Sequence, residues 1–405
     1  AAFIFIQPEL SIAKELSVGL VCALLVVTVM PGQTARIVYT TLCAWIVVRY
    51  IGWRFSSFDE VSVAGFSSSL AGGLLLAAEV YGCAMLLLGL VVNALPLNRK
   101  APKLPRNIED YPTVDIYIPT YSEPMSIVAP TIMGALELDY PAAKKRVYIL
   151  DDGYPRSKNS KDPKQAHELA QRSIQLQEFA KKHGAIWIGR ENNNHAKSGN
   201  LNNAMNYSNG ELLLILDADH VPTKDFLTKT VGFFTRDEKL AFVQTPHFFL
   251  NPDPIERNLG FHNKLPAEND MFYRAVQKGL DLWNASFFCG SAAVIRRKAV
   301  ESIGGFAYSS ITEDAASSIK MHQKGWKSAY YGRPMVAGLQ PESFGAFIVQ
   351  RLRWATGMMQ IFVQQNPLLV RGLTLGQRLS YLSVILFWLF PVARSIFFIA
   401  PFFAI

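Results

Sequence analysis

The chain has 405 residues, of which 50% are hydrophobic and 18% are charged, and its 40 Lys and Arg exceed its 32 Asp and Glu to give a net charge of +8. This composition excludes a disordered polar chain, and the length excludes a short disulfide-stapled module. The basic residues are scattered rather than clustered, so the charge argues against a nucleic-acid partner and favours a membrane surface.

Residues 1–98 are unusually apolar, with nine charged side chains among them. We predict about three membrane-spanning helices in this region, over residues 16–35, 34–53 and 61–97. The last run would be about 55 Å long as a helix, which exceeds the thickness of a bilayer. It should therefore continue beyond the membrane or break near Gly72-Gly73 or Gly82. Glu79 lies within this run and is expected to pair with a neighbouring helix rather than to act in function.

A basic segment, NRKAPKLPR at residues 98–106, follows the third run and carries four positive charges and no acid. The acidic pair Asp59-Glu60 precedes that run and so lies on its other side. By the positive-inside rule, residues 99–375 should be cytoplasmic. A fourth apolar run starts near Leu379 and is unfinished at Ile405, so we expect the natural protein to continue beyond both ends.

From Val114 onwards, short apolar runs alternate with polar helical segments such as Asp162–His183. The runs predicted as strands are Val114–Ile118, Val147–Leu150, Ala185–Ile188, Glu211–Leu216 and Leu240–Val243. The alternation predicts an α/β domain with a mainly parallel, doubly wound sheet, in which ligands bind beyond the carboxyl ends of the strands. The region has neither a GxGxxG nor a Walker A motif, which disfavours a dinucleotide enzyme and a P-loop ATPase.

Two acidic motifs follow predicted strands. Asp151-Asp152-Gly153 comes after VYIL, where a carboxylate can receive a hydroxyl of a sugar or base, although Asp-Gly is also an ordinary turn. Asp217-Ala218-Asp219 comes after LLLIL, and its two carboxylates favour Mg²⁺ or Mn²⁺ bridging a diphosphate. His220 either adds a nitrogen ligand or is a capping or core histidine.

Two further segments precede predicted helices. Thr312-Glu313-Asp314 is either a helix cap with favourable first-turn acids or the site of a general base that deprotonates an acceptor hydroxyl. The segment 195–200, HAKSGN, is either a solvated loop or a place where Lys197 and backbone amides meet phosphate.

The segment QRLRW at residues 350–354 comes just before the last apolar run. Arg suits bidentate recognition of a diphosphate, and Trp offers a flat face for a pyranose. The alternative is an interfacial Trp/Arg anchor, which is common at membrane surfaces. Apolar residues recur at helical spacing over Phe344–Gln365, which predicts an amphipathic helix on the inner leaflet.

The order of these motifs, DDG then DAD then TED then QRLRW between membrane helices, resembles that of the processive family-2 glycosyltransferases. The segments HAKSGN, DADHVPT, QTPHFF, NPDPIERNL, FFCGSAAVIRR, TEDA, AGLQPESF and QRLRWATGMMQ make the chain similar to the bacterial cellulose synthase catalytic subunits over residues 16–405. Those subunits carry further spans and often a C-terminal domain that binds cyclic di-GMP.

The resemblance implies a GT-A-type (Rossmann-like) α/β domain and a UDP-glucose donor with Mg²⁺ or Mn²⁺. The metal would be held by Asp217, Asp219 and His220. The catalytic residues would be Asp314 as the base, with Glu313 and Thr312 beside it. The substrate-binding residues would be Tyr121, Glu123, Asp152, Lys197, Asp217, Cys289, Gln350, Arg353 and Trp354.

We accordingly expect N-terminal membrane helices over 1–98, a cytoplasmic glycosyltransferase domain over 99–342, amphipathic interface helices over 343–377 and a second membrane region over 378–405. The expected protein resides in the bacterial inner membrane and makes β-1,4-glucan by inverting transfer, with a possible periplasmic membrane-anchored partner subunit. Curdlan synthases share the motif set and make β-1,3-glucan, so that linkage or a mixed one is the alternative. A sugar-nucleotide-binding scaffold and a non-processive transferase acting on a lipid carrier are more remote.

Overall fold

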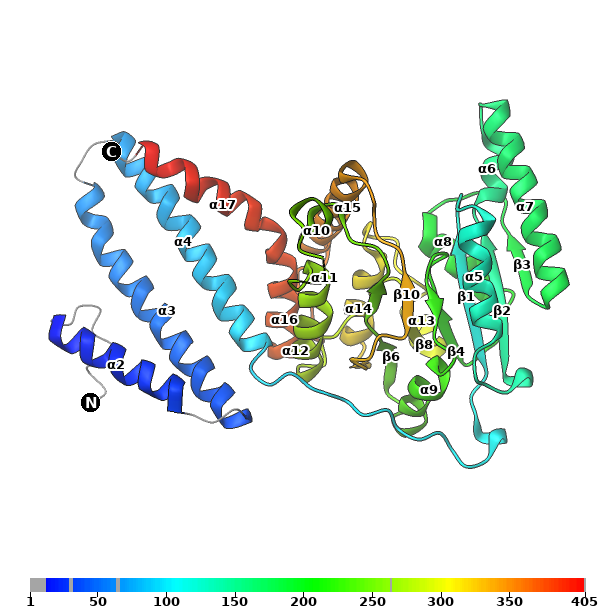
Figure 1. The fold of residues 1–405 in the computed structure, drawn as a ribbon, viewed down its shortest axis with the longest axis horizontal. Coiled ribbons are helices and arrows are strands. Elements are labelled where there is room, and N and C mark those ends of the chain that lie inside the picture. The colour runs from blue at the N-terminus through cyan, green and yellow to red at the C-terminus, as the bar shows by residue number, and fades with distance from the viewer. Residues whose placement is uncertain (1–11, 29–31, 63–65, 263, 404–405) are drawn as a thin grey trace. The chain divides into compact units, whose positions relative to one another are not determined.

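The computed structural model describes residues 12–28, 32–62, 66–262 and 264–403. Its internal contacts divide the chain into two compact units. The first joins residues 1–96 to residues 378–405, and the second comprises residues 97–377. Figure 1 labels helices and strands of both units.

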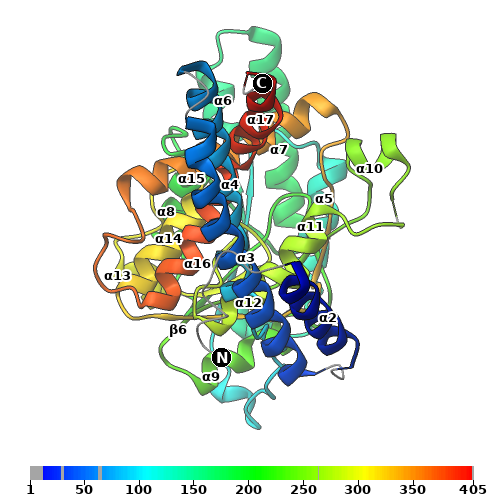
Figure 2. The same cartoon turned by 90° about the vertical axis from the view of Figure 1, so that its left-hand side faces the viewer.

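The first unit is helical. It contains α2 (Ile12–Thr28), α3 (Gln33–Ser62), α4 (Phe66–Val92), most of α16 (Leu375–Leu386), the short η4 (Phe387–Leu389), α17 (Phe390–Ile399) and η5 (Ala400–Phe403). In both views α4 lies beside α17 (Figures 1 and 2). Among the residues that the structure describes, three helical segments are long and apolar enough to cross a membrane, namely Gln33–Phe58, Phe66–Val92 and Leu375–Phe403. The first predicted span falls on α2, which has 17 residues, and on positions outside the described residues.

The helix α4 differs from its prediction. It runs without interruption through Gly72-Gly73 and Gly82 and ends at Val92, so of the two alternatives the break near these glycines is excluded. Each glycine weakens a helix by only about 1 kcal/mol, which a long apolar helix tolerates. Glu79 of α4 pairs with Arg54 of α3 at 2.5 Å, with side chains 12% and 14% exposed. The expected pairing between helices is confirmed, because a carboxylate in apolar surroundings needs a charged partner.

The second unit is built on a sheet of seven strands in the order β3-β2-β1-β4-β8-β6-β9. The strands are β1 (Val114–Thr120), β2 (Lys145–Asp151), β3 (Ile186–Gly189), β4 (Leu212–Ile215), β6 (Leu240–Gln244), β8 (Ala293–Arg296) and β9 (Lys327–Tyr330). All neighbours are parallel except β8, which runs antiparallel to β4 and β6. The predicted α/β sheet is confirmed, while the strands β8 and β9 were not predicted from the sequence.

Helices cover both faces of this sheet, because its strands are apolar on both sides. One face packs against α5 (Met125–Leu136), α7 (Pro163–His183) and α9 (Phe226–Arg236). The other packs against α8 (Ala196–Met205), α13 (Arg297–Ser302) and α14 (Glu313–Gln323). The domain is therefore doubly wound.

The remaining elements of this unit are short or lie outside the main sheet. They are η1 (Ile108–Asp110), η2 (Ala142–Lys144), α6 (Gly153–Asn159), α10 (Pro254–Leu259), α11 (Glu268–Met271), the π-helix η3 (Phe272–Val276), α12 (Gln277–Leu282) and α15 (Phe344–Gln364). A small second sheet joins β5 (Val221–Pro222), β10 (Val336–Gly338) and β7 (His247–Phe249).

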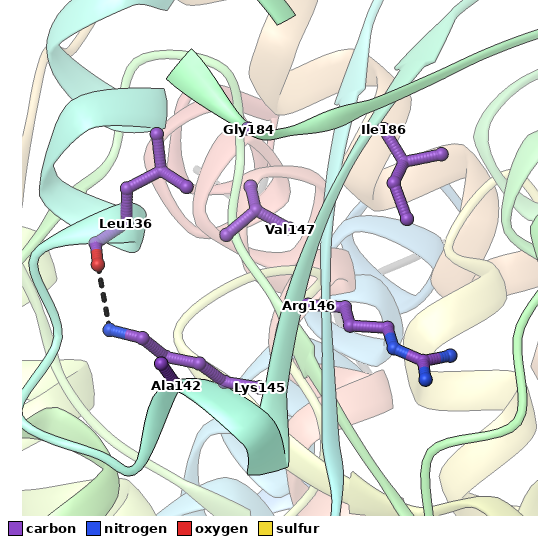
Figure 3. Close-up of a pocket in the computed structure, with 7 residues that line it drawn as sticks. All are labelled: Leu136, Ala142, Lys145, Arg146, Val147, Gly184 and Ile186. Carbon is purple, nitrogen blue, oxygen red and sulfur yellow. Dashed lines mark hydrogen bonds between the residues drawn. The ribbon is translucent and has the colours of Figure 1, made fainter. Parts of the chain in front are cut away.

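The parallel strands β1, β2, β4 and β6 end at one edge of the sheet, and the polar motifs follow them there. A hollow of about 240 Å³ lies instead by Lys145 and Arg146, at the start of β2 (Figure 3). The Lys145 amine donates to the Leu136 carbonyl at 2.7 Å, and burial lowers the pKa of that amine. This hollow therefore lies at the edge opposite the motifs.

Candidate functional site

Four segments of the second unit meet around the amine of Lys197. Lys197, in the first turn of α8, forms an ion pair with Asp217 and donates to the Gly290 carbonyl at 2.8 Å. Gly290 has a φ of 83°, and a Cβ there would lie 3.2 Å from Asp314 Oδ2 and 3.5 Å from the Lys197 amine. The fold thus brings together the end of β4 and the starts of β8, α8 and α14. We call Lys197, Asp217, Gly290 and Asp314 the central cluster.

Burial and neighbouring charges set the protonation of this cluster. Burial raises the pKa of Asp314 to about 7, and the adjacent Glu313 carboxylate adds to the effect. Burial opposes the charge of Asp217, but Lys197 outweighs it and lowers the pKa of that carboxyl. Burial alone would lower the pKa of Lys197, but Asp217 and Glu313 outweigh it and raise that pKa. The cluster therefore holds a permanent ion pair beside a carboxyl poised to take up a proton near neutrality.

The three residues expected to hold a metal lie together after β4. Within the described parts of the chain, no group of three or more His, Cys, Asp and Glu is arranged to hold a metal ion. The His220 ring is buried, with Nδ1 at 2.7 Å from Ser291 Oγ and 3.8 Å from Asp217 Oδ2. Asp219 forms no ion pair with any side chain that the structure describes, and burial raises its pKa. The carboxylates of Asp217 and Asp219 are suitable ligands for Mg²⁺ or Mn²⁺, whose remaining ligands are usually water molecules and substrate phosphates.

Tyr121, Glu123 and Asp152 lie at the carboxyl ends of β1 and β2, outside the central cluster. Asp152 is held by Arg190 through two bonds of 2.6 and 2.8 Å. The Arg190 guanidinium also donates to the carbonyl of Ala196, the residue before Lys197, at 2.8 Å. These bonds connect the DDG motif to the loop that carries Lys197.

The side chains of Tyr121 and Glu123 serve different local contacts. Glu123 accepts a hydrogen bond from the Tyr121 backbone N–H at 2.7 Å. The exposed Tyr121 ring is covered on one face by the Arg156 guanidinium, 4.3 Å from the ring centre. An aromatic face and a guanidinium at this edge suit a planar base with attached phosphates.

Thr312 connects the TED motif to α15. It precedes α14 but its side chain makes no capping bond there, so the cap interpretation lacks its expected contact. Instead its backbone and side chain pack closely against Gly357 of α15. A Cβ added to Gly357 would lie 2.5 Å from Thr312 Oγ1. The Ser310 hydroxyl donates to the Gly357 carbonyl at 2.8 Å. The helix that carries QRLRW therefore supports the loop that carries Asp314.

The QRLRW side chains lie along α15. The Arg351 guanidinium lies 4.3 Å from the Phe347 ring centre and 4.6 Å from that of Trp354. It also donates to Gln350 Oε1 at 2.8 Å and pairs with Glu268 of α11 at 2.9 Å. Arg353 is exposed. Burial raises the pKa of Glu313, and the charges of Lys197 and Arg353 oppose this increase.

A substitution of Gly357 tests this support. Gly357→Ala places a Cβ 2.7 Å from the backbone nitrogen of Thr312, so the TED loop must shift. We expect turnover to fall by about 10²-fold, because misplacement of a reacting group by about 1 Å has that effect. The measurement is kcat beside the melting temperature. Gly345→Ala, which meets nothing within 4 Å on the same helix, is the control and should retain activity. Equal activity of the two variants would contradict the prediction.

Several residues of the site were not singled out from the sequence. Tyr273, in the π-helix η3, has its hydroxyl 2.9 Å from His247 Nδ1. Burial lowers the pKa of His247 to about 3, so this imidazole is neutral. Burial, with Cys289 and Tyr330 nearby, raises the pKa of Tyr273 well above its usual value. His247 lies in QTPHFF, one of the segments on which the family resemblance rests, so the sequence could have indicated it. Tyr273 lies in a π-helix, which has no simple sequence periodicity by which it could be predicted.

Cys289 lies at the turn that leads into β8. Burial raises the pKa of its thiol well above the ordinary range, so it is a neutral group. Its backbone N–H donates to Gln244 Oε1 at 2.9 Å. Cys289 directly precedes Gly290 and so adjoins the central cluster.

Two family models match the chain. Residues 115–304 match "Glycosyl transferase family 2", and residues 212–405 match "Glycosyl transferase family group 2". The "Cellulose synthase 1 catalytic subunit [UDP-forming]" of Komagataeibacter xylinus is 42% identical over 394 residues, 97% of this chain and 50% of that protein. The "Cellulose synthase catalytic subunit [UDP-forming]" of Pseudomonas fluorescens is 42% identical over 98% of this chain and 51% of that protein. The chain thus spans about half the length of these relatives.

A solved structure resembles the fold. It is the "Mannosyltransferase PcManGT from Pyrobaculum calidifontis in complex with GDP-Man and Mn2+", with a TM-score of 0.58 and 19% identity. The match covers 82% of this chain and 86% of that one. The likeness shows the GT-A glycosyltransferase fold.

Proposed function

Because the chain belongs to glycosyltransferase family 2, as a homologue of the bacterial cellulose synthase catalytic subunits, we propose that it is a membrane-embedded β-glucan synthase. It transfers glucose from UDP-glucose to the non-reducing end of a growing β-1,4-glucan and moves the polymer across the membrane. The observation that carries this proposal is the buried Asp314 carboxyl beside the Lys197–Asp217 ion pair. A base and an anion-binding group meet there, as inverting transfer from a nucleotide sugar requires.

The reaction follows from this placement. Asp314 removes the proton from the acceptor 4-hydroxyl, which attacks the anomeric carbon opposite the departing UDP. Glu313 adds to the effect of burial on the pKa of Asp314, and Thr312, two residues before Asp314, packs against Gly357. The amine of Lys197 faces the diphosphate and stabilises the charge that develops on it. A divalent cation held by Asp217 and Asp219, with His220 behind Asp217, would add Lewis-acid stabilisation of the leaving group.

The other predicted contacts extend the site on both sides. Tyr121, Glu123 and Asp152 bind the uridine side of the donor, where Arg156 and Arg190 add positive charge. Gln350, Arg353 and Trp354 of α15 serve the diphosphate and the acceptor sugar. Cys289, a neutral side chain next to Gly290, lies near the acceptor end.

The helices of the first unit supply the membrane region. Residues 1–98 and 378–405 lie in the bacterial inner membrane, residues 99–342 form the cytoplasmic catalytic domain, and residues 343–377 lie at the interface. The exposed apolar side chains of α15 support the last assignment. They are Phe344, Ile348, Val349, Leu352 and Val363. A periplasmic membrane-anchored subunit is the expected partner.

A linkage assay tests the function. The full-length protein in membrane vesicles receives radiolabelled UDP-glucose and Mg²⁺, with and without cyclic di-GMP. The insoluble product is then digested separately with a β-1,4-glucanase and a β-1,3-glucanase. Release by the first enzyme alone supports the proposal, and release by the second alone makes the chain a β-1,3-glucan synthase with the same base. No turnover of UDP-glucose under any condition would contradict both.

The pH dependence of turnover checks the role of Asp314. A general base must be deprotonated, and burial raises the pKa of Asp314 to about 7. We therefore expect kcat to rise with pH through about 7 and to level off roughly one unit above it. The measurement is a kcat profile from pH 5.5 to 9 at saturating UDP-glucose. A profile that is flat through pH 7, or that falls across it, would remove Asp314 as the base.

A further inference from the structure

The loop between Cys289 and β8 has an unfavourable backbone. Gly290 has a φ of 83° and Ala292, a residue with a Cβ, has a φ of 55°. Residues other than glycine rarely adopt this region, and such conformations persist only where surrounding contacts enforce them. The loop also carries the Gly290 carbonyl that binds Lys197. The contacts that hold this loop in its conformation therefore also help to position the Lys197 amine.

Gln244, the last residue of β6, provides that enforcement. Its side chain is 0% exposed and lies against the loop. The amide oxygen accepts the Cys289 N–H at 2.9 Å, and the amide nitrogen donates to the Ser291 carbonyl at 2.9 Å. The same nitrogen donates to the Thr245 carbonyl at 2.8 Å. Gln244 therefore fixes the backbone on both sides of Gly290.

Ser291 extends this connection to the residues that follow β4. Its hydroxyl, also 0% exposed, accepts the Asp217 backbone N–H at 2.8 Å and lies 2.7 Å from His220 Nδ1. Its carbonyl lies 3.1 Å from His247 Nε2, besides accepting from Gln244. One buried residue thus joins the loop at Cys289 to the backbone of Asp217, the residue whose carboxylate pairs with Lys197.

We propose that Ser291 and Gln244 are positioning residues, which hold the Cys289–Gly290 loop and the Asp217 segment as one rigid unit. This inference rests on the proposed function, in which Asp217 and Lys197 face the donor and Cys289 faces the acceptor. Neither Ser291 nor Gln244 touches the reacting atoms. Their loss changes the relative placement of donor and acceptor groups while Asp314, Lys197 and Asp217 all remain.

Two variants test the proposal in the full-length protein. Ser291→Ala removes the hydroxyl that holds Asp217 and His220. Gln244→Glu keeps the shape of the side chain but turns an oxygen towards the carbonyls of Thr245 and Ser291, which repels them. Thr230→Val is the matched control, because Thr230 is equally buried and its hydroxyl binds the Phe226 carbonyl of α9. Ser291→Thr retains a hydroxyl and serves as the conservative variant.

The measurements are kcat, KM for UDP-glucose, the dissociation constant of UDP with Mn²⁺, and the melting temperature. We expect Ser291→Ala and Gln244→Glu to lower kcat by about 10- to 100-fold and to weaken UDP binding. Thr230→Val should lower the melting temperature without either effect, and Ser291→Thr should recover most of kcat. A purely structural role would move only the melting temperature.

The outcomes separate this inference from the proposed function. If Ser291→Ala keeps the wild-type kcat and UDP affinity, the inference is overturned. It is also overturned if Thr230→Val loses as much kcat and UDP affinity as Ser291→Ala does. If Ser291→Ala fails to fold, Gln244→Glu gives the same comparison at another atom of the loop. A wild-type chain that binds UDP without turnover, and loses that binding in Ser291→Ala, would support the positioning role and count against the proposed function.

Discussion

Replacing Asp314 by Asn is expected to abolish glucosyl transfer, lowering kcat by about 10³-fold or more while UDP still binds. Asn has nearly the same shape as Asp but cannot accept a proton, and general-base catalysis contributes about 10²–10⁴-fold. The bond from the Ala315 N–H to Asp314 Oδ1, at 2.8 Å, can be made equally by an amide oxygen. The side chain should therefore keep its position, so that the variant isolates the chemical step.

The measurement pairs turnover of UDP-glucose with the dissociation constant of UDP. Asp225→Asn is the control, because Asp225 forms an exposed ion pair with Arg333 and lies away from the central cluster. That variant should retain nearly full activity, since surface ion pairs contribute little. An Asp314→Asn protein with more than a tenth of the wild-type kcat would exclude Asp314 as the base. A protein that no longer binds UDP would indicate a binding role instead.

Removing the divalent cation, or its proposed ligand Asp219, is expected to have the second large effect. Chelation of the wild-type enzyme should abolish turnover, and Asp219→Ala should lower kcat/KM by about 10³-fold or more. Asp217 alone cannot compensate, because its carboxylate is paired with Lys197. Burial raises the pKa of Asp219, so its deprotonated, metal-binding form declines as the pH falls.

The measurement is UDP affinity with and without Mn²⁺, because that readout does not depend on turnover. In wild type the metal should strengthen UDP binding, and in Asp219→Ala it should not. Asp237→Asn, which alters an exposed pair with Lys327, is the control and should respond to the metal as wild type does. UDP affinity that responds equally to Mn²⁺ in Asp219→Ala and wild type would remove Asp219 from the metal site.

Local sequence patterns predicted most of the catalytic fold, because the central strands are continuous apolar runs between polar helices. The five predicted strands are β1, β2, β3, β4 and β6, and the predicted helix Asp162–His183 is α7 within one residue. Since parallel strands end at a common edge, the sequence also predicted that Asp152 and Asp217 lie at the same edge of the sheet. The roles of these residues remain proposals.

The arrangement within the site was decided by contacts between residues distant in the sequence. Ser291 bonds Asp217 across 74 positions, and Gly357 supports Thr312 across 45 (357 − 312). Neither contact has a local signal, because a short side chain or a missing Cβ matters only once another element packs against it.

The sequence by itself determined five strands of the main sheet, the apolar helical regions and the order of the acidic and aromatic motifs, since each depends on side chains that are neighbours in the chain. Only the tertiary structure decided which polar atoms meet: Lys197 with Gly290, His247 with Tyr273, and Gln244 with Ser291. The physical reason is that a buried polar group must find its partner wherever the fold provides one. That partner is set by the packing of whole elements and not by the spacing of residues along the chain.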